Sequence, residues 1–301
     1  MSFDISKLCE TQVMLGAQAK LYDEHKSWKN LFPQSSETHA IESMDFLLNS
    51  FSDPQELREF LYNSGLKYAC GADISVSTKD PYFAVGVLVV IDVLSLSVIY
   101  QDIIQLDSNL LQVPYLPGFL GLRETPIIVK LIQNLRQKRP DLCVESNGPQ
   151  VILCDGNGRL HPRRCGLATH LGVSENIVAF GVAKTYLEID GISSESIQAK
   201  LQIGVDSIQN QAENAGSRKN HVQWIMTEDN IPEKLGAIVF PYKPAKNAVY
   251  VSIGHRISLE SAVLITLSLM KFRVVEPIRQ ADLIGREYIR MHQSQQNITN
   301  P

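Results

Sequence analysis

The fold is decided by residues 66–105, whose sequence is LKYACGADISVSTKDPYFAVGVLVVIDVLSLSVIYQDIIQ. Three runs rich in β-branched residues occur in it, at about 66–76, 83–91 and 94–105, and turn residues separate them. Because the connections are short, these runs predict three antiparallel strands of one sheet. The apolar stretch from Tyr82 to Tyr100 is long enough to cross a membrane, but Asp92 interrupts it, so two buried strands are the better interpretation.

Strands and helices alternate after this antiparallel unit. The helical face formed by Ile127, Ile128, Leu131, Ile132 and Leu135 predicts a helix at 124–138 that packs on the sheet. The order of elements resembles a ribonuclease H-like α/β fold, a mixed sheet of three antiparallel strands followed by parallel strands, flanked by helices. The other predicted elements are strands at 151–154, 177–182 and 248–253, and helices at 165–173, from Ser258 to Lys271 and from Pro277 to about Arg290.

The residues before the sheet are predicted to be helical. Helices are expected at 3–28 and 38–50, and Asp53-Pro54-Gln55-Glu56 has the cap, the first-turn proline and the acidic residue that begin a helix ending at Gly65. The chain is therefore divided into a helical N-terminal extension, residues 1–65, and a ribonuclease H-like domain, residues 66–301. The polar run from Gln209 to Asn220 lacks apolar periodicity and predicts a flexible loop.

Composition limits the classes to which the chain can belong. With 301 residues, of which 44% are hydrophobic, it can bury a sizeable core and is not a disordered protein. Its net charge of −4 means that a nucleic acid would have to bind to a local basic patch. Five cysteines without a C-x-x-C pair, and an N-terminus without an apolar signal stretch, predict an intracellular protein of the cytoplasm, the nucleus or both, with no membrane partner.

Acidic residues occur where predicted strands end and a predicted helix begins. Asp73 and Asp155 each lie at or near the end of a buried strand, and Glu124 opens the helix between them. A buried carboxylate needs a cation or hydrogen-bond donors, and two or three carboxylates with water and a phosphate are a normal shell for Mg²⁺. Each residue alone also has a structural explanation, with Asp73 capping a turn, Glu124 favouring a helix N-terminus and Asp155 beginning a tight turn.

Two histidines lie in polar segments next to glycines. His255, in Gly254-His255-Arg256, is suited to handling protons, contacting phosphate or binding metal, and a satisfied histidine near a helix start is an equally good interpretation. His161 precedes Pro162-Arg163-Arg164, a basic loop able to contact phosphates, for which a solvated turn is slightly favoured. Asp155-Gly156-Asn157-Gly158 lacks the spacing of a dinucleotide site, so its glycines would serve close approach to a ligand.

Taken together, these segments resemble the endonuclease V family of inosine-directed nucleases, in particular its eukaryotic branch. The resemblance covers about residues 66–290, with a weaker similarity in the helix from Glu10 to Trp28. The matching segments are Gly71-Ala72-Asp73-Ile74-Ser75, the run VPYLPGFLGLRE at 113–124, Asp155-Gly156-Asn157-Gly158 through His161-Pro162-Arg163-Arg164, the segment from Gly166 to Gly172, Gly181-Val182-Ala183-Lys184 and Gly254-His255-Arg256-Ile257-Ser258.

The resemblance implies a role for each site residue. The metal-binding catalytic cluster would consist of Asp73, Glu124 and Asp155, joined by Asp282 from the C-terminal helix. His255 would lie beside the scissile phosphate or its attacking water, and Lys184 would offer positive charge to the phosphate. The strand-separating wedge would be Pro114, Tyr115, Leu116 and Pro117, and the hypoxanthine pocket would use backbone groups of Gly118, Leu120 and Gly156, with His161 nearby.

The resemblance also implies the reaction, which is Mg²⁺-dependent hydrolysis, with Mn²⁺ as a substitute, of a phosphodiester bond 3′ to inosine. The expected partners are inosine-containing single-stranded RNA and deoxyinosine-containing DNA. Two alternatives remain, namely a module that binds inosine-containing RNA with weak or no cleavage, and a metal phosphohydrolase of small nucleotides. The chain departs from the family at Val76, where an aromatic residue is common, and in additions at about 30–60 and 142–149.

Overall fold

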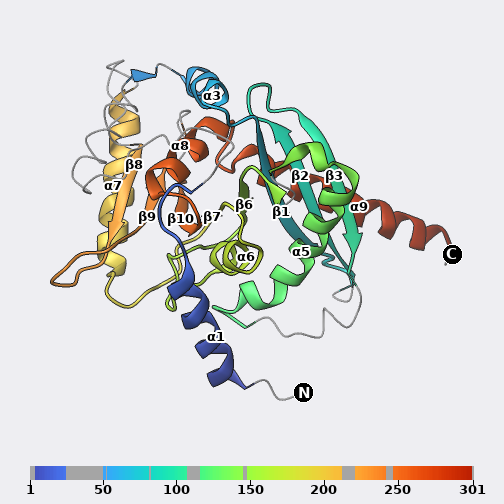
Figure 1. Ribbon diagram of the computed structural model, residues 1–301, viewed down its shortest axis with the longest axis horizontal. Helices are drawn as coiled ribbons and strands as arrows, with labels where there is room; N and C mark the ends of the chain where they lie inside the picture. The colour runs from blue at the N-terminus through green and yellow to red at the C-terminus, as the bar shows by residue number, and fades with distance from the viewer. Residues whose placement is uncertain are drawn as a thin grey trace.

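The computed structural model describes residues 4–24, 50–51, 53–80, 83–106, 116–144, 148–211, 221–241 and 247–299 (Figure 1). Its longer helices are α1 (Ile5–Gln18), α3 (Pro54–Asn63), α5 (Leu120–Lys138), α6 (Leu167–Glu175), α7 (Ser194–Gln211), α8 (Leu259–Leu269) and α9 (Glu276–Thr299). Its main strands are β1 (Tyr68–Val76), β2 (Ala84–Asp92), β3 (Val98–Gln105), β6 (Ile152–Cys154), β7 (Ala179–Ala183), β8 (Val222–Met226), β9 (Lys234–Val239) and β10 (Val249–His255). After the short helix η1 (Pro140–Leu142), strands β4 (Cys143–Val144) and β5 (Gly148–Pro149) form a separate pair.

One eight-stranded sheet crosses the molecule in the order β3-β2-β1-β6-β7-β10-β9-β8. Strands β1, β2 and β3 are antiparallel, whereas β1, β6 and β7 are parallel, with Ile152 opposite both Cys70 and Ala179. Strands β10, β9 and β8 continue the sheet in antiparallel pairing. The predicted mixed sheet is therefore confirmed, and the apolar stretch around Asp92 forms two strands.

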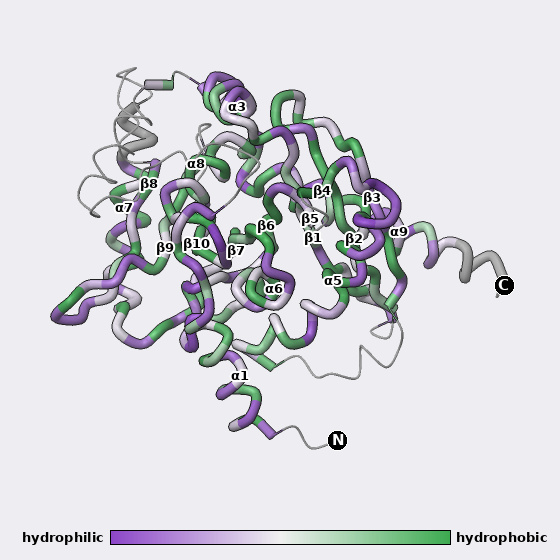
Figure 2. The backbone as a smooth tube through the Cα atoms, viewed as in Figure 1, coloured by the Kyte–Doolittle hydropathy of each residue, from purple (hydrophilic) through white to green (hydrophobic). Residues whose placement is uncertain are grey.

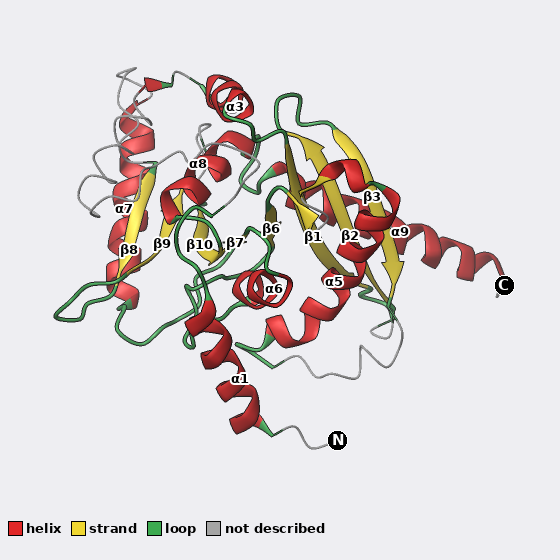
Figure 3. Cartoon of the chain, in the orientation of Figure 1, coloured by secondary structure: helices red, strands yellow, loops and turns green. Residues whose placement is uncertain are grey.

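Helices cover both faces of this sheet (Figure 3). One face packs against α3, α8 and α9, and Leu57, Phe180 and Leu264 are fully buried there. The other face packs against α5 and α6, and Leu131 and Leu171 are fully buried there. Figure 2 shows the hydrophobic residues gathered along the central strands and the hydrophilic residues toward the outer turns. The core thus consists of two apolar layers with the sheet between them.

A close approach fixes α9 on β1. A Cβ atom at Gly71 would lie 2.4 Å from the carbonyl carbon of Pro277, in the first turn of α9, so a residue with a side chain would push the helix away from the strand. Asp282 follows Pro277 by little more than one helical turn. The glycine in β1 therefore lets α9 bring Asp282 to the end of this strand.

The helix that carries Glu124 begins earlier than predicted. Pro126 is compatible with a first helical turn, so the sequence favours a start near Glu124, but α5 begins at Leu120 and includes Pro126 in its interior. Glu124 consequently lies in the second turn of α5 and not at its N-terminus. At the N-terminus of the chain, α1 ends at Gln18, well before the predicted end, and the predicted helix at 38–50 lies outside the described residues apart from Ser50.

Hydrophobic periodicity does not predict α7, β8 or β9, which follow one another between residues 194 and 239. Helix α7 extends to Gln211, so the first residues of the predicted loop are helical, and residues 212–220 lie outside the described part of the chain.

The domain boundary near residue 65 stays a prediction. Two helices that precede it pack on the rest of the chain, α1 on α6 and α3 on α8. Among the helices described, none combines the length and apolar character that crossing a membrane requires.

Candidate active site

Asp73 lies near the carboxyl end of β1, one residue beyond the pairing of Ala72 with Cys154 of β6. Successive strand residues point to opposite faces, so Asp73 shares the α9 side of the sheet with Gly71. Ser75 Oγ donates a hydrogen bond of 3.0 Å to Asp73 Oδ2. Burial raises the pKa of Asp73 to about 6, and repulsion from Asp155 and Asp282 adds to the rise.

Asp155 directly follows β6 and begins a tight turn in which Gly156 N donates to Cys154 O at 2.9 Å. Lys184 directly follows the neighbouring strand β7, and its Nζ donates to Asp155 Oδ2 at 2.5 Å. Because β1, β6 and β7 are parallel, their carboxyl ends bring Asp73, Asp155 and Lys184 to one edge of the sheet. The Lys184 ammonium group offsets the charge of one carboxylate at this edge.

Glu124 reaches the same edge from α5, on the other face of the sheet. Burial raises the pKa of Glu124 to about 8, and repulsion from Asp73 and Asp155 adds to the rise, while Arg123 opposes it. Asp73 and Asp155 are therefore close enough for their charges to act on the Glu124 carboxyl group.

Asp282 approaches from α9. It lines a groove of about 490 Å³ together with Asp73, Ser75 and Arg286. Arg286 Nε donates to Asp282 Oδ1 at 2.8 Å, and the Asp282 charge contributes to the raised pKa of Asp73. We refer to Asp73, Glu124, Asp155 and Asp282 as the carboxylate cluster.

The carboxylate cluster offers the oxygen donors that a hard divalent cation prefers. Within the ranges that the structure describes, no three His, Cys, Asp or Glu side chains are arranged as a complete metal-binding group. A Mg²⁺ ion does not need one, because one or two carboxylates usually hold it and water and phosphate complete its shell. Burial is the main cause of the raised pKa values of Asp73 and Glu124, and repulsion from neighbouring carboxylates adds to it, so a bound cation would oppose both effects. The residues present therefore fit a bound divalent cation.

His255 does not lie with the carboxylate cluster. It is paired with Ala179 at the start of β7, whereas Lys184 follows the end of that strand. Strand β10 is antiparallel to β7, so its last residue lies at the opposite edge of the sheet from Asp155. Contrary to what the resemblance implies, His255 therefore does not lie beside the scissile phosphate, because the direction of β10 places it at the other end of the strands.

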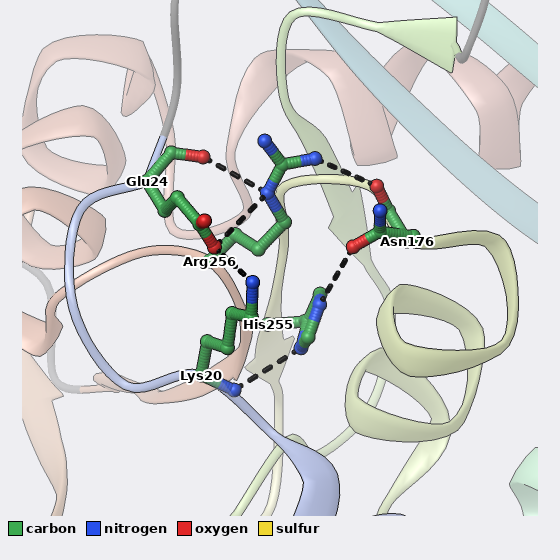
Figure 4. A network of polar contacts seen from close by, with 5 residues as sticks. All are labelled: Lys20, Glu24, Asn176, His255 and Arg256. Carbon is green, nitrogen blue, oxygen red and sulfur yellow. Dashed lines mark hydrogen bonds and ion pairs between the residues drawn. The ribbon is translucent and has the colours of Figure 1, made fainter.

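The His255 ring is 3% exposed and bonded on both sides, as Figure 4 shows. Its Nδ1 accepts from Lys20 N at 3.1 Å, and its Nε2 lies 3.2 Å from Asn176 Oδ1. Burial lowers the pKa of His255 to about 4, and Arg256 and Lys20 add to the effect. His255 is therefore a neutral, satisfied histidine that joins the N-terminal segment to the end of α6.

A cavity of about 420 Å³ adjoins the carboxylate cluster. Four residues predicted for the base pocket line it, namely Gly118, Leu120, Gly156 and His161. Asp155 and Lys184 line it as well, so the cavity and the carboxylate cluster share a wall. In the predicted wedge, Leu116 and Pro117 immediately precede Gly118, while Pro114 and Tyr115 lie outside the described residues.

His161 is buried in the cavity wall, with Nε2 at 3.0 Å from Gly118 O and Nδ1 at 3.3 Å from Arg163 N. A carbonyl only accepts and a backbone N–H only donates, so the ring donates through Nε2 and accepts at Nδ1. Burial lowers the pKa of His161 to about 4, and Arg163 contributes to the lowering. The ring is therefore held neutral and in one tautomer.

Two residues behind this wall are assigned otherwise, or not at all, from the sequence. The sequence makes the loop at 162–164 able to contact phosphate, with a solvated turn slightly favoured, whereas Arg163 Nη2 donates to Gly118 O at 2.7 Å and its guanidinium lies 4.2 Å from the centroid of the Phe119 ring. Gln12 of α1, which the sequence analysis does not single out, is fully buried against the same group. The available signal is its helical spacing from Leu8 and Leu15, which places a polar residue on the inward stripe of α1.

A model of the endonuclease V family matches residues 53–283 of the chain. The chain is similar to mouse endonuclease V, with 39% identity over 231 residues that make up 75% of this chain and 61% of the mouse protein. It is similar to human endonuclease V, with 36% identity over 234 residues, 75% of this chain and 73% of the human protein. The chain thus spans about three fifths of the length of its mouse relative.

Solved structures of endonuclease V proteins match most of the chain. The catalytic domain of human endonuclease V matches with a TM-score of 0.71 and 30% identity, covering 96% of this chain and 97% of that domain. A variant of Ciona intestinalis endonuclease V, bound to a 23mer DNA containing an inosine followed by a ribo-adenosine, matches with a TM-score of 0.71 and 26% identity, covering 96% of this chain and 99% of the other.

Proposed function

Because this chain belongs to the endonuclease V family, whose members are nucleases, we propose that it hydrolyses the phosphodiester bond 3′ to inosine in single-stranded RNA. Deoxyinosine-containing DNA is proposed as a second substrate. The observation that carries the proposal is the position of Asp155, which lines the cavity and is also a member of the carboxylate cluster. A base held in the cavity would leave its adjoining phosphate beside the carboxylates.

The proposed metal is Mg²⁺, with Mn²⁺ as a substitute. Asp73 and Asp155 at the strand ends, with Glu124 and Asp282 from the two flanking helices, would hold it. Once bound, the ion would supply positive charge to the scissile phosphate and lower the pKa of a nearby water. The positive charge of the ion would thus lie at the carboxyl ends of β1 and β6, where the carboxylate cluster is.

The chain's own residues orient the substrate around this position. Lys184 Nζ, 2.5 Å from Asp155 Oδ2, holds that carboxylate and presents a positive charge at the cavity mouth. His161 stays neutral, so it adds no charge to the part of the cavity wall that it forms. His255 is left out of the catalytic group because it lies at the other edge of the sheet.

One comparison supports the preference for RNA. The nucleic acid bound to the Ciona protein has a ribo-adenosine directly after its inosine, so a ribose occupies the position next to the base. We propose that this chain accepts a ribose at the same position.

Cleavage of matched oligonucleotides tests the proposal. Single-stranded RNA and DNA, each with inosine or guanosine at one position, would be incubated with the protein in Mg²⁺ or in chelator. We expect a single cut 3′ to inosine, faster in RNA, only with metal. Retained binding of inosine-containing RNA without cleavage in either Mg²⁺ or Mn²⁺ would instead identify a binding module.

A further inference from the structure

A buried glutamine on α1 is bonded to the wall of the base cavity. Gln12 is 0% exposed, and its Nε2 donates to Gly118 O at 3.1 Å and to Cys165 O at 3.2 Å. Its Oε1 accepts from Arg163 Nε at 2.5 Å. The amide of one side chain therefore ties α1 to the turn at Gly118, which lines the cavity, and to the loop that follows His161.

The Gly118 carbonyl is the point where these bonds meet. Gln12 Nε2, Arg163 Nη2 and His161 Nε2 lie 3.1, 2.7 and 3.0 Å from its oxygen. Three donors saturate one carbonyl, which has two lone pairs. The carbonyl therefore points into the protein. Because the peptide bond is planar, these contacts also fix the orientation of the peptide between Gly118 and Phe119, which leads to Leu120 in the cavity lining.

Helix α1 is itself held firmly enough to act as a support. A Cβ atom at Gly16 would lie 2.9 Å from Arg163 O, so the glycine allows α1 to lie directly on the loop. Arg159 Nη1 also donates to Gly16 O at 3.3 Å. Beyond the helix, Lys20 N and Glu24 O are bonded to His255 and Arg256, as Figure 4 shows for these side chains.

We propose that Gln12 is a positioning residue for base recognition, which fixes the Gly118 wall together with Arg163 and thereby sets the preference for inosine. The inference rests on the proposed function of the cavity. Gln12 does not itself line the cavity but is bonded to Gly118, which does, and its other partners are Cys165 and Arg163 rather than the carboxylate cluster. It therefore acts on the fit of the base and not on the chemical step. A wall free to rotate at Gly118 would accept bases other than hypoxanthine.

The test compares Gln12→Met, which keeps the length of the side chain and removes its hydrogen bonds, with Gln18→Met. Gln18 is an exposed glutamine at the end of the same helix and provides the matched control. For wild type and both variants, kcat and KM would be measured on RNA oligonucleotides with inosine or guanosine at one position, and Tm would confirm folding.

In Gln12→Met, we expect the ratio of kcat/KM for inosine to that for guanosine to fall about tenfold, since loss of one buried hydrogen bond has roughly this effect. The fall should come from a higher KM for the inosine substrate with kcat within about twofold of wild type, because uniform binding is lost and the chemical step is not. Gln18→Met should match wild type. A global loss of structure would lower the active fraction and hence kcat, leaving the ratio between bases unchanged.

An unchanged ratio in folded Gln12→Met overturns the inference. If Gln12→Met does not fold, Arg163→Lys, which removes the Nε and Nη2 contacts to Gln12 and Gly118 from the other side, carries the same expectation and the same refutation. Failure of the proposed function is a separate result, because wild type would then not cleave next to inosine at all.

Discussion

At the scale of single residues, the carboxylate cluster is the feature with the sharpest consequence. Asp155→Asn keeps the shape of the side chain and an oxygen for Lys184 but removes one negative charge beside the cavity. We expect single-turnover cleavage of inosine-containing RNA to fall by about 10²–10³-fold or more, as for other groups that stabilise charge in a transition state. Asp229→Asn, at an exposed carboxylate, is the control and should cleave normally. Normal turnover in folded Asp155→Asn would show that Asp155 does not take part in cleavage.

Glu124 allows a test that needs no substrate. Its pKa in the folded protein is raised to about 8 from 4.5, so the fold favours its neutral form. The stability that this form contributes is present below about pH 4.5 and is lost as pH rises through about 8. In chelator, Glu124→Gln should therefore be more stable than wild type at pH 8.5 by roughly 1–3 kcal/mol and nearly equal at pH 4.5. Denaturant unfolding at both pH values measures this, and equal stability at pH 8.5 would show that Glu124 is not buried among carboxylates.

The sequence predicts part of this residue-scale arrangement. Asp73 and Asp155 can be placed together because they lie at or near the ends of neighbouring buried strands, and Gly156 and His161 because they follow Asp155 within six residues. His255 cannot be placed in the same way, since a residue at a strand end lies at one edge or the other according to the direction of the strand. That direction depends on the pairing of β10 with β7, which a single sequence does not display.

At the scale of elements, His255 links β10, the end of α6 and the segment after α1. His255→Ala removes the acceptor for Lys20 N and the partner of Asn176 Oδ1, so we expect a loss of stability of about 1–3 kcal/mol and faster hydrogen exchange at 19–24. The single-turnover rate at saturating enzyme should stay within about threefold of wild type, because the ring is far from the carboxylate cluster.

Asn176→Gly offers an independent route to the same contact. Asn176 has φ +52°, a conformation that glycine adopts freely, so this change removes the bond to His255 without backbone strain. It should reproduce the faster exchange at 19–24. A large loss of the chemical rate in His255→Ala, with 19–24 still protected, would return His255 to the catalytic group.

Elements with a clear pattern are predictable from the sequence, and those that depend on partners are not. Strands β1, β2 and β3 have β-branched runs and short turns, and Ser258 caps α8 as its sequence predicts, by accepting from Ser261 N. Strand β8 is short, and its buried and partly buried residues do not alternate strictly, so its apolar signal is weak. Helix α5 starts at Leu120 without a capping side-chain hydrogen bond, so no capping residue in the sequence marks its start.

At the scale of the whole molecule, the carboxylate cluster links metal binding to stability. Bound cation would stabilise the folded protein by about 2.7 kcal/mol at one hundred times its dissociation constant, if the unfolded chain does not bind it. We expect Mg²⁺ to raise the Tm of the wild type at pH 8 by several degrees, and to raise it much less in Asp73→Asn or Asp155→Asn. Calorimetry of the three proteins in chelator and in Mg²⁺ measures the difference. An equal rise in all three would place the cation elsewhere.

The contacts between the N-terminal segment and β10 also have a consequence for synthesis. Lys20 and His255 are 235 residues apart, and so are Asp23 and Ser258, whose backbone N–H donates to the Asp23 carboxylate. At a synthesis rate of about 5–20 residues per second, roughly 10–50 s pass between the synthesis of the first partner of each contact and that of the second. The segment after α1 therefore reaches these partners only when the chain is nearly complete, well after β1 and β6, with Asp73 and Asp155, have been synthesised.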